Sequence, residues 1–366
     1  MRVALDATPL IGPRTGVGHY VAGLLDGLLS LADPPELALT AFTFRGRKDL
    51  QAPPGARVAA RPAPARLLQA AWLRGGFPPV ELLSGRADVF HGTNFVLPPR
   101  RRAAGVLMIH DLAYEKLPEV VTAASLRYRS LVPRALRDGQ VVVTTPTAAV
   151  ADEVAEFYRI DRSRVVPTPL GVAEHWYDAM PAAARWLDQH GLPGRYLLFV
   201  GSLEPRKNLG VLLEAHAQAR KENPVVPALV LVGPPGWGDA VQHRDGVVST
   251  GYLPHPQLRQ LVAGAVALAL PSRYEGFGLP LLEAFAAGTP VIAGRVPALQ
   301  EISAGLAPMV DPDDVEGLAG EIVMVSTTDT SAGRDARRQR AREFTWQRCA
   351  EATMRAYLQA TGTLNR

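Results

Sequence analysis

Two carboxylates flank a glycine-rich turn in the second half of the chain. Glu275 and Glu283 are separated by seven residues that include two glycines and a proline, and the turn follows the apolar run 266–270. Glycine permits a tight turn with uncovered backbone N–H groups, and Pro280 suits the first turn of a helix. The N-terminus of such a helix attracts anions. Carboxylates beside it accept hydrogen bonds from sugar or ribose hydroxyls. The alternative is a plain strand–turn–helix connection with an acidic residue at its favoured end.

A second loop carries adjacent cations. Gly201 ends the apolar run 196–200, and Arg206, Lys207 and Asn208 precede an expected helix. Asn208 is predicted to be the N-cap of that helix. Arg and Lys beside a helix N-terminus suit a diphosphate. The alternative for such a pair is a solvated loop.

A glycine pair, Gly16 and Gly18, stands between the first expected strand and the first expected helix, just after Arg14. The third glycine of a dinucleotide-binding fingerprint is missing, and no acidic residue closes the next strand. We therefore expect an amide-rich loop that contacts phosphate or acceptor.

A histidine–aspartate pair, His110 and Asp111, follows the expected strand 105–109. An imidazole at a strand end can face a substrate. His91, after the expected strand 88–90, is a weaker example of the same arrangement. A structural role is the alternative for both histidines.

No metal site is predicted. Asp311 and Asp313 match the Asp-x-Asp pattern of metal-dependent sugar transferases, but they precede a helical pattern and are expected to cap that helix. The single cysteine, Cys349, excludes an internal disulfide and a cysteine-based metal cluster.

The net positive charge of the chain lies in its first half. The formal net charge is +4, and between Arg45 and Arg137 there are 16 basic and 6 acidic residues. Such a basic region suggests an anionic partner, unless its arginines only keep the surface soluble. Arg127, Arg134 and Arg137 are expected to share one face of a helix over 123–138. A short apolar stripe around Leu67, Leu68, Ala71 and Trp72, flanked by Arg66 and Arg74, suits an interfacial contact or a core.

Strands and helices alternate twice along the chain, which predicts an α/β fold with parallel sheets. The first set of expected strands is 2–8, 37–44, 88–90, 105–109 and 140–145, and the second is 196–200, 228–232, 247–250, 266–270 and 291–293. Segment 46–85, rich in Pro and Arg, has no assignment. In such sheets ligands bind beyond the carboxyl ends of the strands, where all the motifs above lie.

These motifs together resemble the retaining glycosyltransferase family 4, and Ala4–Thr8 with Gly16–Tyr20 is similar to its bacterial mannosyltransferase branch. The resemblance covers nearly the whole chain. It implies a GT-B fold, in which two Rossmann-like, doubly wound domains face each other across a cleft. Residues 1–178 would bind the acceptor and residues 179–345 the nucleotide sugar. A C-terminal helix within 346–366 would cross back to the first domain.

The resemblance also implies roles for individual residues. Arg206 and Lys207 would hold the diphosphate, Glu283 the ribose and His110 the transferred sugar. Glu275 would grip the sugar and phosphate together with the amides of Phe277, Gly278 and Leu279. Gly16, Gly18 and Gly201 would complete the donor site. His110 and Glu275 are the expected catalytic residues.

The expected function is metal-independent transfer of a hexose, mannose first, from a GDP- or UDP-linked donor by a retaining front-face mechanism, with no cofactor. The acceptor would be a glycan, a lipid-linked or anionic molecule, or a natural product, and nucleic acid is not an expected partner. Alternatives are a sugar-nucleotide epimerase, a glycosyl phosphorylase or a non-catalytic nucleotide-sugar-binding protein. A cytoplasmic protein is expected, with peripheral contact to the inner face of the cell membrane.

Overall fold

The chain folds into two compact units in a computed structural model. The structure describes residues 1–12, 16–43, 47–59, 64–234 and 244–363. The first unit contains residues 1–171 and 345–366, and the second contains residues 172–344. The sequence places the corresponding boundaries after residues 178 and 345. None of the described helices is long and apolar enough to span a bilayer.

The first unit is built on a seven-stranded parallel sheet in the order β3-β2-β1-β4-β5-β6-β7. Its strands are β1 Arg2–Asp6, β2 Glu36–Thr40, β3 Ala56–Val58, β4 Val89–Gly92, β5 Ala104–Met108, β6 Val142–Thr145 and β7 Val165–Pro167. The central strands are almost completely buried, as expected for a parallel sheet covered on both faces.

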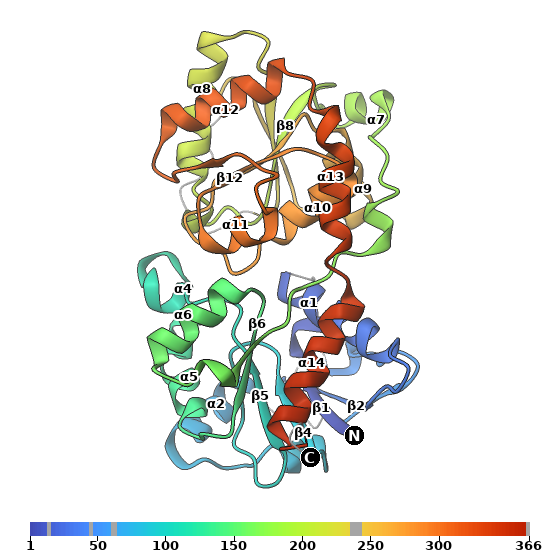
Figure 1. Cartoon of the computed structure of the whole chain (residues 1–366), viewed down its shortest axis with the longest axis vertical. Helices are drawn as coiled ribbons and strands as arrows, with labels where there is room; N and C mark the ends of the chain where they lie inside the picture. The colour runs from blue at the N-terminus through green and yellow to red at the C-terminus, as the bar shows by residue number, and fades with distance from the viewer. Residues whose placement is uncertain (13–15, 44–46, 60–63, 235–243, 364–366) are drawn as a thin grey trace. The chain divides into compact units, whose positions relative to one another are not determined.

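Helices cover this sheet, and the last helix of the chain is one of them (Figure 1). They are α1 Gly16–Leu29, α2 Ala65–Gly75, α3 Glu81–Ser84, α4 Ala113–Lys116, α5 Tyr128–Leu136, α6 Ala148–Tyr158 and α14 Trp346–Ala360. Two glycines of α1 let α14 approach closely. A Cβ on Gly27 would lie 2.2 Å from the Trp346 carbonyl oxygen, and one on Gly23 would lie 2.1 Å from the Trp346 ring.

The predicted arginine-bearing helix over 123–138 is wrong in its bounds. The chain first forms a 3-10 turn, Ser125–Arg127, in which the Thr122 hydroxyl accepts from the Ser125 N–H, and α5 begins at Tyr128. Arg127 precedes α5 and Arg137 follows it, and both keep helical backbone dihedrals. Arg134 donates to the Leu73 carbonyl at 2.9 Å.

The apolar stripe around α2 divides between core and surface. Trp72 is buried, and its indole N–H donates to the Pro78 carbonyl at 2.9 Å. Leu68 is also buried, whereas Leu67 is 70% exposed. Half of the stripe therefore belongs to the core.

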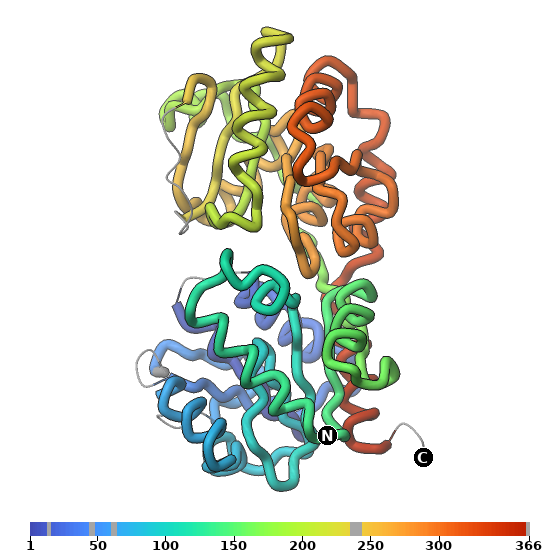
Figure 2. The backbone as a smooth tube through the Cα atoms, turned by 90° about the vertical axis from the view of Figure 1, so that its left-hand side faces the viewer, coloured from blue at the N-terminus to red at the C-terminus, as the bar shows by residue number. Residues whose placement is uncertain are grey.

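The second unit contains a six-stranded parallel sheet in the order β10-β9-β8-β11-β12-β13. Its strands are β8 Tyr196–Val200, β9 Ala228–Val232, β10 Val247–Gly251, β11 Leu268–Leu270, β12 Val291–Gly294 and β13 Met309–Val310. Its helices are α7 Ala184–Gln189, α8 Leu209–Glu222, α9 His255–Gly264, α10 Leu279–Ala287, α11 Pro297–Ser303, α12 Val315–Thr327 and α13 Arg334–Arg342. Figure 2 shows α8 and α12 packed side by side.

β1 lies inside the sheet of the first unit, and β8 lies inside the sheet of the second, each with a neighbouring strand on both sides. Beside each of these two strands, the direction in which the chain adds strands to the sheet reverses. Such a reversal places loops from neighbouring strands around a crevice at the carboxyl edge. The loops after β8, β11 and β5 carry the residues singled out by the sequence.

Candidate active site

Lys207 is a buried cation in the loop after β8. The chain leaves β8 at Gly201 and forms a 3-10 turn, Pro205–Lys207, before α8 begins. Lys207 is only 7% exposed, so its ammonium needs a partner. That partner is Glu275, which is also 7% exposed and accepts a hydrogen bond from Lys207 Nζ.

Glu275 gathers the polar groups of both loops. Its Oε2 lies 3.3 Å from Arg206 Nη1, and its Oε1 accepts from the Ser272 hydroxyl at 2.7 Å. Arg206 also donates through Nε to Glu204 at 2.9 Å. The structure thus brings Arg206, Lys207 and Glu275 together, although 68 residues separate the lysine from the glutamate.

The charges of this cluster keep the carboxylate ionised. Burial alone would raise the pKa of Glu275, but the neighbouring Lys207 and Arg206 outweigh burial and hold that pKa at about 2. At neutral pH, Glu275 is therefore an acceptor for Lys207, Arg206 and hydroxyl donors.

The entrance of α10 presents unpaired backbone amides. Gly278 occupies the N-cap position with φ of 91°, and Pro280 lies in the first turn, as the sequence predicts. No described residue accepts a hydrogen bond from the backbone N–H of Phe277, Gly278 or Leu279. Unpaired donors at a helix N-terminus, together with the helix dipole, attract an anion.

Glu283 lies one turn into α10 as a buried carboxyl group. It is 8% exposed, and within the described ranges it has neither a hydrogen bond nor an ion pair. Burial raises its pKa to about 8. Because an unpaired buried carboxylate is costly, hydroxyl donors from a ligand would stabilise it.

Asn208 occupies the N-cap position of α8, as the sequence predicts, but its side chain does not cap the helix. Asn208 has φ of 60°, and its side chain makes no capping hydrogen bond to α8. Its Nδ2 donates to the carbonyls of Pro271 and Pro312, and its Oδ1 accepts from Arg273 Nε at 3.0 Å. Asn208 therefore ties three loops at the carboxyl edge of the sheet together.

The expected capping role of the Asp-x-Asp segment is also wrong. Asp314 caps α12, with its Oδ1 accepting from the Gly317 N–H at 2.8 Å. Asp313 instead pairs with Arg273 at 2.7 Å, and Asp311 accepts from the Asp313 N–H at 3.0 Å. No cluster of three or more His, Cys, Asp or Glu side chains that could hold a metal occurs among the residues that the structure describes.

In the first unit, His110 stands at the end of β5 with a defined ring orientation. Its Nε2 donates to the Thr93 carbonyl at 2.9 Å, and the Thr93 hydroxyl donates to the Asp6 carbonyl at 2.6 Å. The ring packs edge-on against Tyr20 and Phe95. Burial lowers the pKa of His110 to about 4, so the imidazole is neutral at physiological pH.

Sequence reasoning did not single out Asp6 as a site residue. Asp6 is buried at the end of β1, and its Oδ1 accepts from both the N–H and the hydroxyl of Thr8. Burial raises its pKa to about 6. The only available signal was its place at the end of an apolar strand. Ser272 and Glu204 carried no sequence signal, because their partners come from distant or irregular segments.

The remaining candidate residues lie in different parts of the fold. Gly16 and Gly18 lie at the start of α1, with Gly18 buried, whereas Arg14 lies outside the described residues. Gly201 directly follows β8, as expected. His91 is completely buried, and its Nδ1 bonds the Tyr357 hydroxyl of α14 at 2.8 Å. The structural alternative therefore holds for His91.

Comparison with known proteins shows which proteins this chain is similar to. Residues 194–327, which contain both loops of the cluster, match the family described as glycosyl transferases group 1. The O-antigen chain mannosyltransferase B of Escherichia coli is 29% identical over an alignment that covers 98% of this chain and 99% of the relative. The chain is a glycosyltransferase. The expected resemblance to family 4 enzymes of the mannosyltransferase type is thereby confirmed.

Solved structures confirm the fold of this glycosyltransferase. Sucrose-phosphate synthase from Thermosynechococcus elongatus superposes with a TM-score of 0.72, at 21% identity and 98% coverage of both chains. HepE from Anabaena, solved in complex with UDP, superposes with a TM-score of 0.65, at 17% identity over 97% of this chain and 99% of HepE. The expected GT-B class, two parallel-sheet α/β domains, is correct.

Proposed function

We propose that this glycosyltransferase moves a hexose, with mannose the first candidate, from a GDP- or UDP-linked donor to a hydroxyl of a glycan, lipid-linked or natural-product acceptor. Transfer retains the anomeric configuration and needs no metal ion or other cofactor. The mannosyltransferase relative that spans the whole chain supports mannose. Because HepE was solved in complex with UDP, we propose a UDP-linked donor as well as a GDP-linked one.

One observation carries the donor assignment. The buried Lys207–Glu275–Arg206 cluster directly precedes the unpaired amides of the α10 entrance. Only one of the three N–H groups of the Lys207 ammonium is used by Glu275. Ammonium, guanidinium and backbone N–H groups together match the oxygens of a diphosphate. Glu283 is then the acceptor for the ribose hydroxyls.

The proposed step is a front-face displacement. The bond between the sugar C1 and the diphosphate oxygen breaks, and the acceptor oxygen bonds C1 on the same face. The acceptor hydroxyl proton passes to the departing phosphate oxygen. Lys207, Arg206 and the amides of 277–279 stabilise the charge that develops on the diphosphate. Ionised Glu275 would contact the hydroxyls of the transferred sugar.

A panel of nucleotide sugars tests this proposal. Thermal unfolding is followed with each donor in excess, because a ligand at a hundred times its dissociation constant stabilises the native state by roughly 2.7 kcal/mol. The productive donor is then incubated with candidate acceptors, and NMR reads the anomeric configuration of the product. An inverted product contradicts the retaining mechanism. Conversion of the donor sugar without any acceptor would indicate an epimerase.

Metal independence has its own test. Activity is measured after extensive dialysis against EDTA, and we expect the rate to be unchanged because cationic side chains stand where a metal would otherwise balance the diphosphate. Loss of activity that Mn²⁺ or Mg²⁺ restores would contradict this expectation and return attention to Asp311 and Asp313.

Peripheral membrane contact is part of the proposal for the first unit. Leu67 projects from α2 beside the exposed Arg66 and Arg74. Basic residues near an anionic surface contribute about 1 kcal/mol each. Co-sedimentation with anionic vesicles should be weakened by Leu67→Glu, and equal pelleting with neutral vesicles would contradict a charge-dependent contact.

A further inference from the structure

A cavity of about 880 Å³ opens at the amino edge of the sheet in the first unit. Arg2 begins β1, Asp88 precedes β4, Ala104 begins β5 and Gln140 precedes β6, and all four line the cavity. Because the strands are parallel, His110 after β5 lies at the opposite edge. A five-residue strand spans about 16 Å. The cavity is therefore distinct from the candidate active site.

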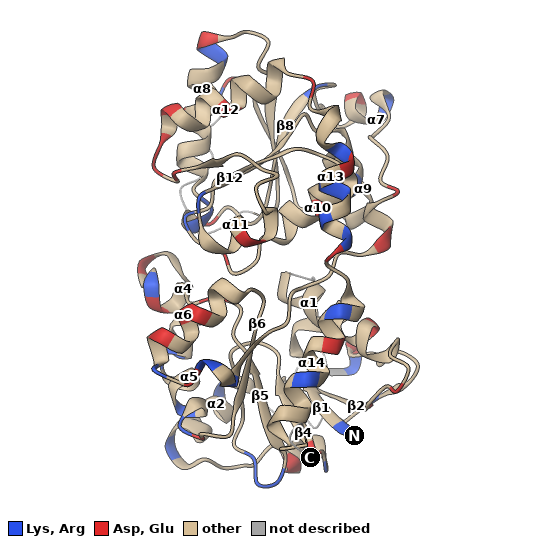
Figure 3. Cartoon of the chain, viewed as in Figure 1, with Lys and Arg blue, Asp and Glu red and all other residues tan. Residues whose placement is uncertain are grey.

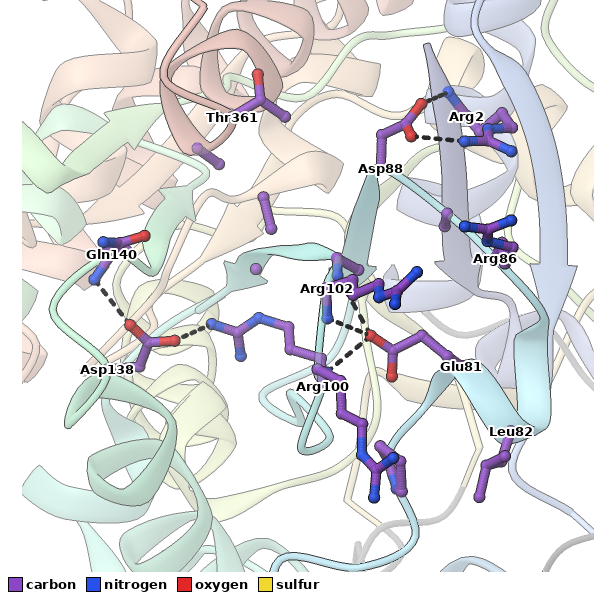
Figure 4. Close-up of a pocket in the computed structure, with 17 residues that line it drawn as sticks. Arg2, Glu81, Leu82, Arg86, Asp88, Arg100, Arg102, Asp138, Gln140 and Thr361 are labelled. Atoms are coloured by element: carbon purple, nitrogen blue, oxygen red, sulfur yellow. Dashed lines mark hydrogen bonds and ion pairs between the residues drawn. The ribbon is translucent and has the colours of Figure 1, made fainter.

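Two ion pairs frame this cavity (Figure 4). Asp88 accepts from the backbone N–H of Arg2 at 2.8 Å and from its guanidinium at 3.0 Å. Across the cavity, Arg100 pairs with Asp138. The Arg100 guanidinium lies directly over Gly105, where a Cβ would come within 2.4 Å of its Cζ.

Glu81 holds the loop between β4 and β5 in place. Its Oε1 accepts from the backbone N–H groups of residues 101, 102 and 103, at 2.8, 2.8 and 3.2 Å. Burial would raise the pKa of Glu81, but these hydrogen bonds outweigh it and lower that pKa. The backbone of the loop is thus fixed by one carboxylate.

Three arginines at the cavity remain without a carboxylate. Arg86, Arg101 and Arg102 line it, are exposed, and form no ion pair with any described residue. Figure 4 shows Arg86 and Arg102 between the Arg2–Asp88 pair and Glu81, and Figure 3 shows the basic loop between β4 and β5. In total five arginines and three acidic residues line the cavity, which leaves a formal surplus of two positive charges.

We propose that this cavity binds a phosphate monoester on a ligand of the size of a phosphorylated saccharide, through Arg86, Arg101 and Arg102. Guanidinium groups pair with phosphate through two parallel hydrogen bonds, and their positive charge persists at all physiological pH values. The volume lies in the range of small-molecule sites and exceeds the need of a phosphate ion. The ligand is either a free sugar phosphate or the phosphate head group of a lipid.

Two triple variants of the whole chain test the proposal. The cavity variant combines Arg86→Ala, Arg101→Ala and Arg102→Ala. The control variant combines Arg57→Ala, Arg185→Ala and Arg355→Ala, three exposed arginines away from the cavity that also have no ion pair among the described residues. Both variants lose the same charge and both keep the candidate donor site, so a difference between them reports the cavity.

Calorimetric titration with a hexose 6-phosphate is the first measurement. We expect the control variant to bind as the original chain does, and the cavity variant to bind at least tenfold more weakly. A third variant with lysine at the three cavity positions should keep part of the affinity, because charge remains while the bidentate geometry is lost. Equal affinity of the cavity and control variants would overturn the proposal.

Vesicles distinguish the two sources of the phosphate. Pelleting with phosphatidic acid vesicles, lost in the cavity variant and kept in the control variant, would support the proposal with a lipid head group as the source. Hexose 6-phosphate binding that depends on the cavity, with no pelleting, would support it with a soluble ligand. Equal behaviour of the two variants in both assays would overturn it. Neither assay uses a nucleotide sugar, so the result is independent of the proposed donor function.

Discussion

At the residue scale, Glu283 has an unpaired carboxyl group inside a folded unit. Its pKa of about 8 means that the free protein holds a proton there at neutral pH. Accepting hydrogen bonds from ribose hydroxyls favours the ionised form. Binding of the donor nucleotide is therefore expected to release this proton.

This linkage predicts that nucleoside diphosphate affinity rises between pH 7 and pH 8 and levels off above it. Glu283→Gln should bind more weakly and without this pH dependence, as measured by calorimetry.

The same substitution changes the pH dependence of the unfolding free energy. An unfolded glutamate ionises near pH 4.5 and the folded one near 8, so the native state loses stability as pH rises between these values. Glu283→Gln should therefore be more stable than the original chain at pH 8. A parallel pH dependence in the two proteins would contradict the assignment.

The pKa of Glu275 is shifted in the opposite direction from that of Glu283, down to about 2. Its contribution to stability is complete above about pH 4.5 and is lost as pH falls toward 2. Glu275→Gln would leave Lys207 buried without its counter-charge. Losing one partner of a buried pair costs about 3–5 kcal/mol. The substitution should thus destabilise the fold as well as abolish transfer.

A double-mutant cycle separates these two effects. Lys207→Met combined with Glu275→Gln removes both charges, and we expect most of the lost unfolding free energy to return while transfer stays abolished. Thermal unfolding and a transfer assay are measured on all four proteins. Normal transfer by Glu275→Gln would show that the carboxylate is only structural.

At the element scale, the N-terminus of α10 depends on one glycine. Gly278 has φ of 91°, and a Cβ there would lie 2.3 Å from Leu299 Cδ2. The positive φ alone costs a residue with a side chain roughly 1–2 kcal/mol. If the backbone shifts to relieve this contact, the N–H groups of residues 277–279, which face the proposed phosphate, shift with it.

Gly278→Ala should therefore lower both thermal stability and nucleoside diphosphate affinity. Gly288→Ala is a matched control, because Gly288 ends the same helix with φ of 86° and its Cβ would meet the flexible Arg334 side chain. We expect it to lower stability only. Equal affinities in the two variants would argue against a phosphate at the α10 entrance.

At the scale of the whole molecule, the first unit is completed by the end of the chain. Helix α14 packs on α1, and a Cβ on Gly27 would meet the Trp346 backbone oxygen at 2.2 Å. In contrast, a Cβ on Gly320 of α12 would meet no atom within 4 Å. Both glycines lie inside helices, where alanine is intrinsically better by about 1 kcal/mol.

The two alanine substitutions should therefore have opposite signs. Gly320→Ala is expected to raise the unfolding free energy by up to about 1 kcal/mol, and Gly27→Ala to lower it by about 1–3 kcal/mol. Denaturant unfolding measures both. Gly27→Ala should leave nucleoside diphosphate binding intact, because Arg206, Lys207 and Glu283 lie in the second unit. Stabilisation by Gly27→Ala would contradict the close helix packing.

The sequence alone predicted those features that depend on local pattern. Apolar runs ending in glycine gave β8 and β9 at their observed bounds, and glycine and proline chemistry gave the start and end of α10. Segment 46–85 was unassigned because its many prolines and arginines obscure the patterns of β3, α2 and α3.

Only the tertiary structure decided how these elements meet. The carboxylate that neutralises Lys207, the conformation of Asn208 and the burial of Glu283 all depend on segments distant in sequence or on surrounding side chains. The cavity of unpaired arginines likewise forms from the loops before three strands and the end of α14. A pattern along one segment determines its own backbone, whereas charge pairing and desolvation depend on what the rest of the chain places around it.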